Sequence, residues 1–161
     1  DYGLLEAVAA AVPQGTLLLA GRVSIPVGRR YPSGFESLTR RPNVHQTGAL
    51  DAGRMVGIVD NLDVGLLPYR PTDANRHASP VKLFDYLQAH VPVVSSGVID
   101  LGDAAPWVSE ARDVGDFVAA VGHALRSGPI GPGIDSWLQC NTAAARADAA
   151  LEVLAEAETM R

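Results

Sequence analysis

The chain has 161 residues, of which 47% are hydrophobic and 19% charged, and its formal net charge at pH 7 is −5. A soluble chain of this length forms one domain and buries roughly two thirds of its unfolded surface. The acidic balance argues against nucleic acid as a partner, and no apolar run approaches a membrane span. Cys140 is the only cysteine, which excludes an internal disulfide and favours a cytoplasmic setting.

The first half of the chain alternates predicted helices and strands. Pro13 and Gly15 end the first helix, short apolar runs that close on glycine are typical of buried strands, and Asp51 is a good N-cap. A long irregular connection with one turn of helix fills residues 22–42. In chain order, we expect a helix at 3–12, strands at 16–21 and 43–48, a helix at 52–61 and a strand at 63–69.

The second half continues this alternation after an irregular loop over residues 70–78. Ser79 is the expected N-cap of the next helix and Pro80 its first-turn residue, while Asp113 and Gly128 bracket a later helix. The remaining predicted elements are a helix at 80–90, a strand at 92–96, a short strand near 107–111, a helix at 113–128 and a long alanine-rich helix at 135–158.

This alternation of apolar strands and helices predicts an α/β fold, a Rossmann-like doubly wound parallel sheet with helices on both faces. Ligands bind such sheets at the carboxyl ends of the strands. A doubly wound fold starts with a central strand, whereas this chain opens at a helix. Either residues 1–161 form one domain of an unusual fold, or they form one domain that lacks its first strand and is part of a longer two-domain chain.

Lys82, the only lysine, stands in the first turn of the helix predicted at 80–90. The helix macrodipole disfavours a cation there, and a bound phosphate would reverse that sign. The free N–H groups of Val81 and Lys82 would face the same anion. Asp85 lies on the same helix face, where its carboxylate can accept two ribose hydroxyls. The alternative is a solvated Lys82–Asp85 pair that contributes less than about 1 kcal/mol.

The distribution of charge also points to an anionic ligand. Residues 22–82 carry nine basic and five acidic side chains, a net +4, whereas residues 83–161 sum to −7. Scattered, solvated arginines explain the same numbers equally well. The sequence from Ser79 to Lys82 matches the SxxK nucleophile motif, but a chain with one lysine cannot supply the KTG element of those enzymes. Four separated histidines and one cysteine predict no metal site.

Three stretches in order carry a family resemblance: "PNVHQTGAL", "DNLDVGLLPY" and "SPVKLFDYLQAHVPVVSSG". They resemble the donor half of GT-B glycosyltransferases of bacterial cell-surface polysaccharide synthesis. The resemblance implies the C-terminal domain of a hexosyltransferase, of the retaining type, that binds a nucleoside-diphosphate sugar as substrate and needs no cofactor. It also implies a carbohydrate or lipid-linked acceptor bound by an N-terminal domain, inactivity of this part alone, and a cytoplasmic location, peripheral to the inner membrane face.

The resemblance carries over to individual residues, although it names no catalytic base. Asp85 stands where relatives have a longer Glu, and His77 stands where many have a second Glu. The residues implied are Ser79, Val81 and Lys82 for the diphosphate, Asp85 for the ribose, Thr47, Gly48 and Ala49 for the base, and Arg76 and His77 for the sugar.

Two other classes of function remain open at this point. A non-enzymatic α/β regulatory or assembly module would use the acidic C-terminal helix as an interface and bind no nucleotide. A nucleotide-sugar epimerase of GT-B-like fold would need catalytic carboxylates and histidines around a cleft.

Overall fold

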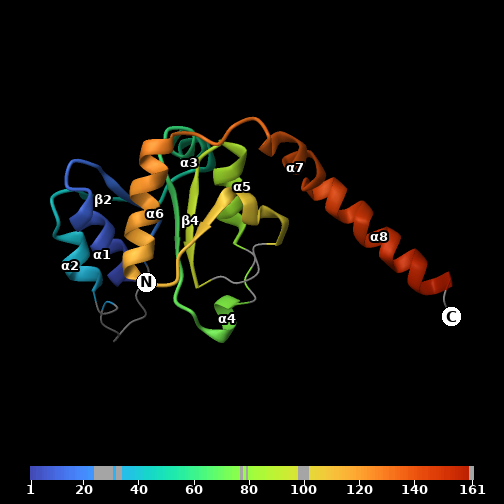
Figure 1. Cartoon of the computed structure of the whole chain (residues 1–161), viewed down its shortest axis with the longest axis horizontal. Coiled ribbons are helices and arrows are strands. Elements are labelled where there is room, and N and C mark those ends of the chain that lie inside the picture. The colour runs from blue at the N-terminus through green and yellow to red at the C-terminus, as the bar shows by residue number, and fades with distance from the viewer. Residues whose placement is uncertain (24–30, 32–33, 77, 79, 98–101, 160–161) are drawn as a thin grey trace.

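The computed structural model describes residues 1–23, 31, 34–76, 78, 80–97 and 102–159, and it alternates strands with helices as the sequence predicts (Figure 1). The first elements are α1 (Tyr2–Ala11), β1 (Leu17–Ala20), α2 (Phe35–Thr39), β2 (Val44–Gly48), α3 (Ala52–Val59), β3 (Gly65–Pro68) and α4 (Asp73–Arg76). The later elements are α5 (Val81–Gln88), β4 (Val93–Ser96), the 3-10 helix η1 (Gly102–Trp107), β5 (Val108–Glu110), α6 (Val114–Ser127), α7 (Ile134–Cys140) and α8 (Ala143–Thr159).

Every strand pair among the described residues is parallel. β1 pairs with β2 in a two-stranded sheet, and β3, β4 and β5 pair in that order in a three-stranded sheet. Parallel strands joined by helices define an α/β fold of Rossmann-like type, which confirms the predicted fold class.

Helices cover both faces of the three-stranded sheet. Successive side chains of β4 point to opposite faces, so each face contributes apolar residues to a separate cluster. Val93 packs with Leu83 and Leu87 of α5 on one face. Val94 packs on the other face, in a cluster that α1 and α6 supply and that includes Phe117. Figure 1 shows α6 and α5 on opposite sides of β4. The core of the domain is therefore layered, with the sheet in the middle.

The two sheets do not pair with each other in the described part of the chain, since β1 and β3 each have one strand neighbour there. β1 and β3 are therefore edge strands of two separate parallel sheets among the described residues.

The capping residues confirm most predicted helix starts. The carboxylate of Asp51 accepts a hydrogen bond from the Arg54 amide at 2.9 Å, and that of Asp113 accepts one from the Asp116 amide at 2.9 Å. Gly128 closes α6 with a φ of 72°, a conformation that glycine adopts without strain.

Three local predictions are wrong. Helix α5 begins at Val81 with Pro80 as its N-cap, one residue later than expected, so Pro80 is not the first-turn residue. Helix α4 was expected to be irregular loop, and the Thr72 hydroxyl, which accepts from the Asn75 amide at 3.3 Å, initiates it. The predicted helix over 135–158 is two helices, α7 and α8. Thr142 caps α8 by accepting from the Ala145 amide at 3.1 Å.

The turn between α5 and β4 depends on His90, the described non-glycine residue with a positive φ, 58°. Its Nδ1 lies 3.1 Å from the Ile130 carbonyl oxygen and its Nε2 lies 3.1 Å from an Asp135 carboxylate oxygen. These contacts hold a residue with a Cβ in a conformation that glycine would adopt more easily.

Candidate functional site

The candidate site lies at the carboxyl ends of the strands, where the first turn of α5 begins. The Asp1 amino group donates a hydrogen bond to the carbonyl of Pro68, the last residue of β3. The N-terminus and α4 therefore both lie at this edge of the sheet (Figure 1). Parallel α/β sheets bind ligands here because strand ends and helix N-termini meet at one edge.

Buried leucines fix the position of α5, and its first turn stays open to solvent. Leu83 and Leu87 are 3% and 0% exposed, whereas Val81 is 74% exposed and Lys82 is exposed. The amide of Leu83 donates to the Pro80 carbonyl at 2.9 Å. The Val81 and Lys82 amides precede it, in the turn where helices leave N–H groups unpaired. These two amides and the Lys82 ammonium form a positive first turn without a side-chain cap.

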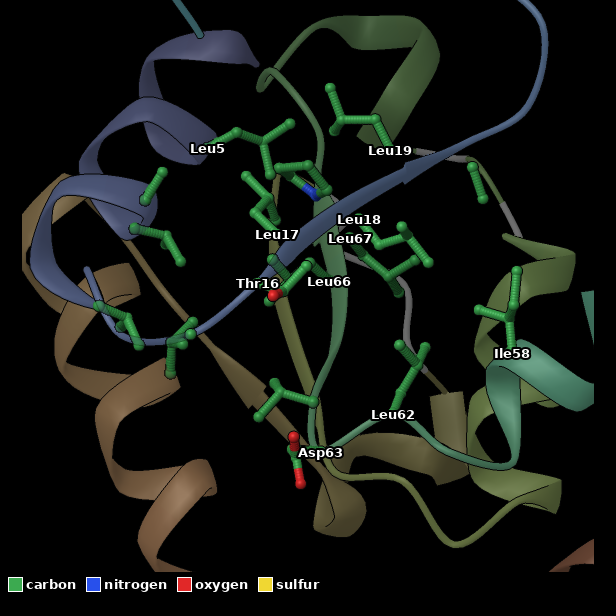
Figure 2. Close-up of a pocket in the computed structure, with 18 of the residues that line it drawn as sticks. Leu5, Thr16, Leu17, Leu18, Leu19, Ile58, Leu62, Asp63, Leu66 and Leu67 are labelled. Atoms are coloured by element: carbon green, nitrogen blue, oxygen red, sulfur yellow. The ribbon is translucent and has the colours of Figure 1, made fainter. Parts of the chain in front are cut away.

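Lys82 borders a cavity of about 920 Å³. Gly21 and Arg22, which follow β1, and Pro68 and Tyr69, at the end of β3, line the same cavity. Its deeper part is apolar, and Figure 2 shows leucines entering it from α1, β1 and β3. The cavity therefore has two basic residues, Arg22 and Lys82, near the carboxyl ends of the strands, and its interior is lined mainly by leucines.

Tyr86 lines this cavity one helical turn after Lys82. Burial raises the pKa of its hydroxyl above the ordinary value of 10.0, and the negative charge of Asp85 and then Tyr69 add to the effect. Asp85 itself is exposed and is not one of the cavity-lining residues.

Thr47 and Gly48 close the end of β2 and contact the chain after β1. The Gly21 amide donates to the Gly48 carbonyl at 3.1 Å and lies 3.3 Å from the Thr47 hydroxyl. That hydroxyl also donates to the Gly48 carbonyl at 3.0 Å. Thr47 and Gly48 thus contact Gly21, which lines the cavity, but neither of them lines it, and Ala49 is exposed beyond the strand.

The other predicted residues stand apart from this cavity. Arg76 is exposed at the end of α4, and its side chain does not line the cavity. His77 and Ser79 lie outside the described residues. No ion pair joins Lys82 to Asp85 in the described part of the chain, so the alternative of a surface pair gains no support.

Two residues of the site were not singled out from the sequence. Arg22 directly follows the glycine that ends a predicted strand, and this position at a strand end was the available signal. Tyr86 read as an ordinary helix residue. Its place in the cavity depends on how α5 packs against β3, which no local pattern reports.

No cluster of three or more His, Cys, Asp or Glu side chains among the described residues could hold a metal ion. None of the helices in the described part of the chain combines the length and apolarity that crossing a membrane requires.

The structure is a Rossmann-like α/β domain with a basic helix N-terminus at the carboxyl edge of its strands. The chain is 31% identical over 124 residues to the "Putative teichuronic acid biosynthesis glycosyltransferase TuaH" of Bacillus subtilis (strain 168). The match covers 74% of this chain and 30% of TuaH, so the chain spans under a third of that protein's length. Neither a protein-family profile nor a solved structure matches the chain. The chain is therefore related to a glycosyltransferase.

Proposed function

We propose that this chain is the donor-binding domain of a glycosyltransferase of GT-B architecture, and that its substrate is a nucleoside-diphosphate sugar. The observation that carries the proposal is the uncapped first turn of α5, with Lys82 at the mouth of the cavity. The relationship to TuaH supports a role in the synthesis of a cell-surface polymer.

The diphosphate would bind at the N-terminus of α5. The Val81 and Lys82 amides point their hydrogens out of the helix end, and the helix dipole adds a partial positive charge. The exposed ammonium of Lys82 and the guanidinium of Arg22 border the same cavity. A ligand with two negative phosphates matches this arrangement better than a neutral one does.

The nucleoside would extend from the diphosphate towards Asp85 and the end of β2. Asp85 is one turn beyond Lys82, and its exposed carboxylate can accept both ribose hydroxyls. Thr47, Gly48 and Ala49 would border the base. The Thr47 hydroxyl already bonds within the protein, so recognition of the base would use backbone groups. The sugar would lie towards Arg76 and His77.

In sugar transfer the nucleoside diphosphate leaves with growing negative charge, while the sugar passes through an oxocarbenium-like state. The first turn of α5 is fixed by buried Leu83 and Leu87, so its N–H groups would need no reorganisation to stabilise that charge. The acceptor would be a carbohydrate or a lipid-linked carbohydrate held by the rest of the protein. The transfer would retain the anomeric configuration, which NMR of the product tests.

The experiment is calorimetric titration of the complete protein with UDP, GDP, ADP and dTDP, followed by the same titration of four variants. Lys82→Ala and Asp85→Ala should each raise the Kd of the preferred nucleotide by roughly 10- to 100-fold, because each removes hydrogen bonds to or from a charged group. Arg126→Ala and Asp148→Ala remove exposed charges from α6 and α8, away from the site, and should leave the Kd unchanged.

The possible failures separate the alternatives. Nucleotide binding that neither Lys82→Ala nor Asp85→Ala weakens would mean that the site is misplaced. Absence of binding for all four nucleotides would favour a non-enzymatic regulatory or assembly module.

A further inference from the structure

His90 joins the turn between α5 and β4 to the start of α7. The Ile130 amide donates to the His90 carbonyl at 2.8 Å, and Nδ1 of the His90 ring lies 3.1 Å from the Ile130 carbonyl oxygen. On the other side of the ring, Nε2 lies 3.1 Å from an oxygen of the Asp135 carboxylate. One side chain therefore connects the turn before β4 both to the segment before α7 and to α7 itself.

Both ring nitrogens of His90 face hydrogen-bond acceptors. A carbonyl oxygen and a carboxylate oxygen have no proton to donate, so each contact needs an N–H group on the ring. A neutral imidazole carries one N–H group, whereas the imidazolium carries two. The arrangement around His90 is therefore satisfied in full only by the protonated ring, whose positive charge also pairs with Asp135.

The charged and titratable side chains on the elements in contact with His90 come from two helices. They are Asp135 and Cys140 of α7 and Lys82, Asp85 and Tyr86 of α5. The segment between α6 and α7 and the strand β4 contribute none. Asp135 forms the ion pair that the described residues make with the ring, so the charge of His90 acts mainly on α7.

The attachment of α7 to the domain is slight, so one polar contact matters to it. α7 has seven residues, and isolated helices of fewer than about 12 residues are marginal in water. Ile134 is its buried residue, and the Trp137 ring stacks on the Phe84 ring of α5 with centroids 5.6 Å apart. None of residues 143–157 of α8 is buried, so α8 also depends on the docking of α7.

We propose that His90 and Asp135 form a pH-sensitive latch for the C-terminal helices. The imidazolium binds Asp135 and Ile130 together and holds α7, with α8 beyond it, against α5. When the ring loses its proton, one of these two contacts is lost and α7 opens more often. Histidine side chains change their charge between pH 5 and 8, while carboxylates keep theirs across that range. The latch is therefore tighter towards pH 5 and looser towards pH 8.

The test follows amide hydrogen exchange in the complete protein, without nucleotide, between about pH 5.5 and 8. Protection factors, which correct each rate for the intrinsic effect of pH, are compared for α7 and for Val121 of α6, which packs in a different cluster. His90→Gly removes the ring and suits the positive φ of 58°. Asp135→Asn removes the carboxylate charge. His123→Gln is the matched control, because it removes a histidine of α6 that bonds to Ser127.

In the parent protein the protection of α7 should fall by roughly 2- to 10-fold as the pH rises, because one hydrogen bond between side chains that are 35% and 53% exposed is lost. His90→Gly and Asp135→Asn should remove this dependence on pH, and His123→Gln should keep it.

The proposal is overturned if the protection of α7 does not change with pH, or if His90→Gly leaves the change intact. It is also overturned if Val121 loses protection to the same extent, since the whole domain would then respond to pH. The proposal goes beyond nucleotide binding, and none of these outcomes depends on whether Lys82 binds a diphosphate.

Discussion

Replacing Gly97 with alanine should separate the carboxyl ends of β3 and β4 and destabilise the fold. Gly97 directly follows β4 and has a φ of 70°, in the region that residues with a Cβ adopt only with strain. A Cβ built there would overlap the Tyr69 carbonyl oxygen and lie 2.7 Å from the Arg70 carbonyl carbon. The neighbouring Ser96 hydroxyl donates to the same Tyr69 carbonyl at 3.1 Å, so the backbone cannot move away freely.

The expected cost combines two contributions. The left-handed conformation costs an alanine roughly 1–2 kcal/mol, and relieving the overlap with backbone costs roughly 1–3 kcal/mol. A loss of about 2–5 kcal/mol is a large part of the stability of a domain, which is about 5–15 kcal/mol. For a chain of this length it corresponds to a fall in Tm of between about 4 and 20 °C.

Thermal unfolding followed by circular dichroism measures this fall. Gly131→Ala is the matched control, because its φ is not positive and a Cβ there would meet nothing within 4 Å. That variant should stay within about 0.5 kcal/mol of the parent protein. If the two alanine variants unfold at the same temperature, then Gly97 does not hold the strand ends as described and the reasoning about this edge is wrong.

Two further predictions concern the packing of α1 and α5. Asn43→Ala should lower the free energy of unfolding by about 1–3 kcal/mol, because Nδ2 of Asn43 donates to two carbonyls at the end of α1, at 2.8 and 3.1 Å. Urea denaturation measures this loss, and Asn61→Ala, which removes one exposed hydrogen bond, is the control. Equal losses in the two variants would contradict the prediction. The raised pKa of Tyr86 means that the folded protein keeps this proton when the unfolded chain loses it, so the free energy of unfolding should fall as the pH rises above 10.0. Tyr86→Phe should show a smaller fall in urea titrations between pH 9 and 11, and identical pH profiles would refute that assignment.

Much of the fold was predictable because its signals are local. An apolar run that ends in glycine located β1, a second stretch that ends in glycine located β2, and carboxylates before apolar runs located the starts of α3 and α6. These patterns depend only on strand burial and on the unpaired N–H groups of a helix end. The order of elements then predicted a parallel sheet with helices on both faces.

The errors arose where two local preferences compete. Thr142 lies inside a long alanine-rich stretch, and its preference for an N-cap position ends α7 and begins α8. Pro80 could occupy either the N-cap or the first turn of α5, and its extended backbone, with ψ of 112°, makes it the N-cap. Propensity alone does not resolve such choices.

The cavity was the least predictable part of the site. Lys82 was singled out because a lone lysine at a helix start is unusual, but its neighbours Arg22 and Tyr86 are about sixty residues apart in the chain. Their convergence depends on how β1 and α5 are placed around β3. That arrangement follows from the topology of the whole sheet, which leaves no mark at either position.

Because α7 and α8 are separate helices, α8 extends away from the rest of the fold (Figure 1). Figure 1 shows α8 leading away from the layered body, and Leu151, Val153 and Leu154 along it are 61–65% exposed. The Arg146 guanidinium lies over the Phe84 ring at 4.7 Å, which anchors the first turn of α8 to α5. The 17 residues of α8 make it about 26 Å long, and about 20 Å of that length lies beyond Arg146. Because α5 also carries Lys82, this contact joins α8 to the helix that borders the cavity.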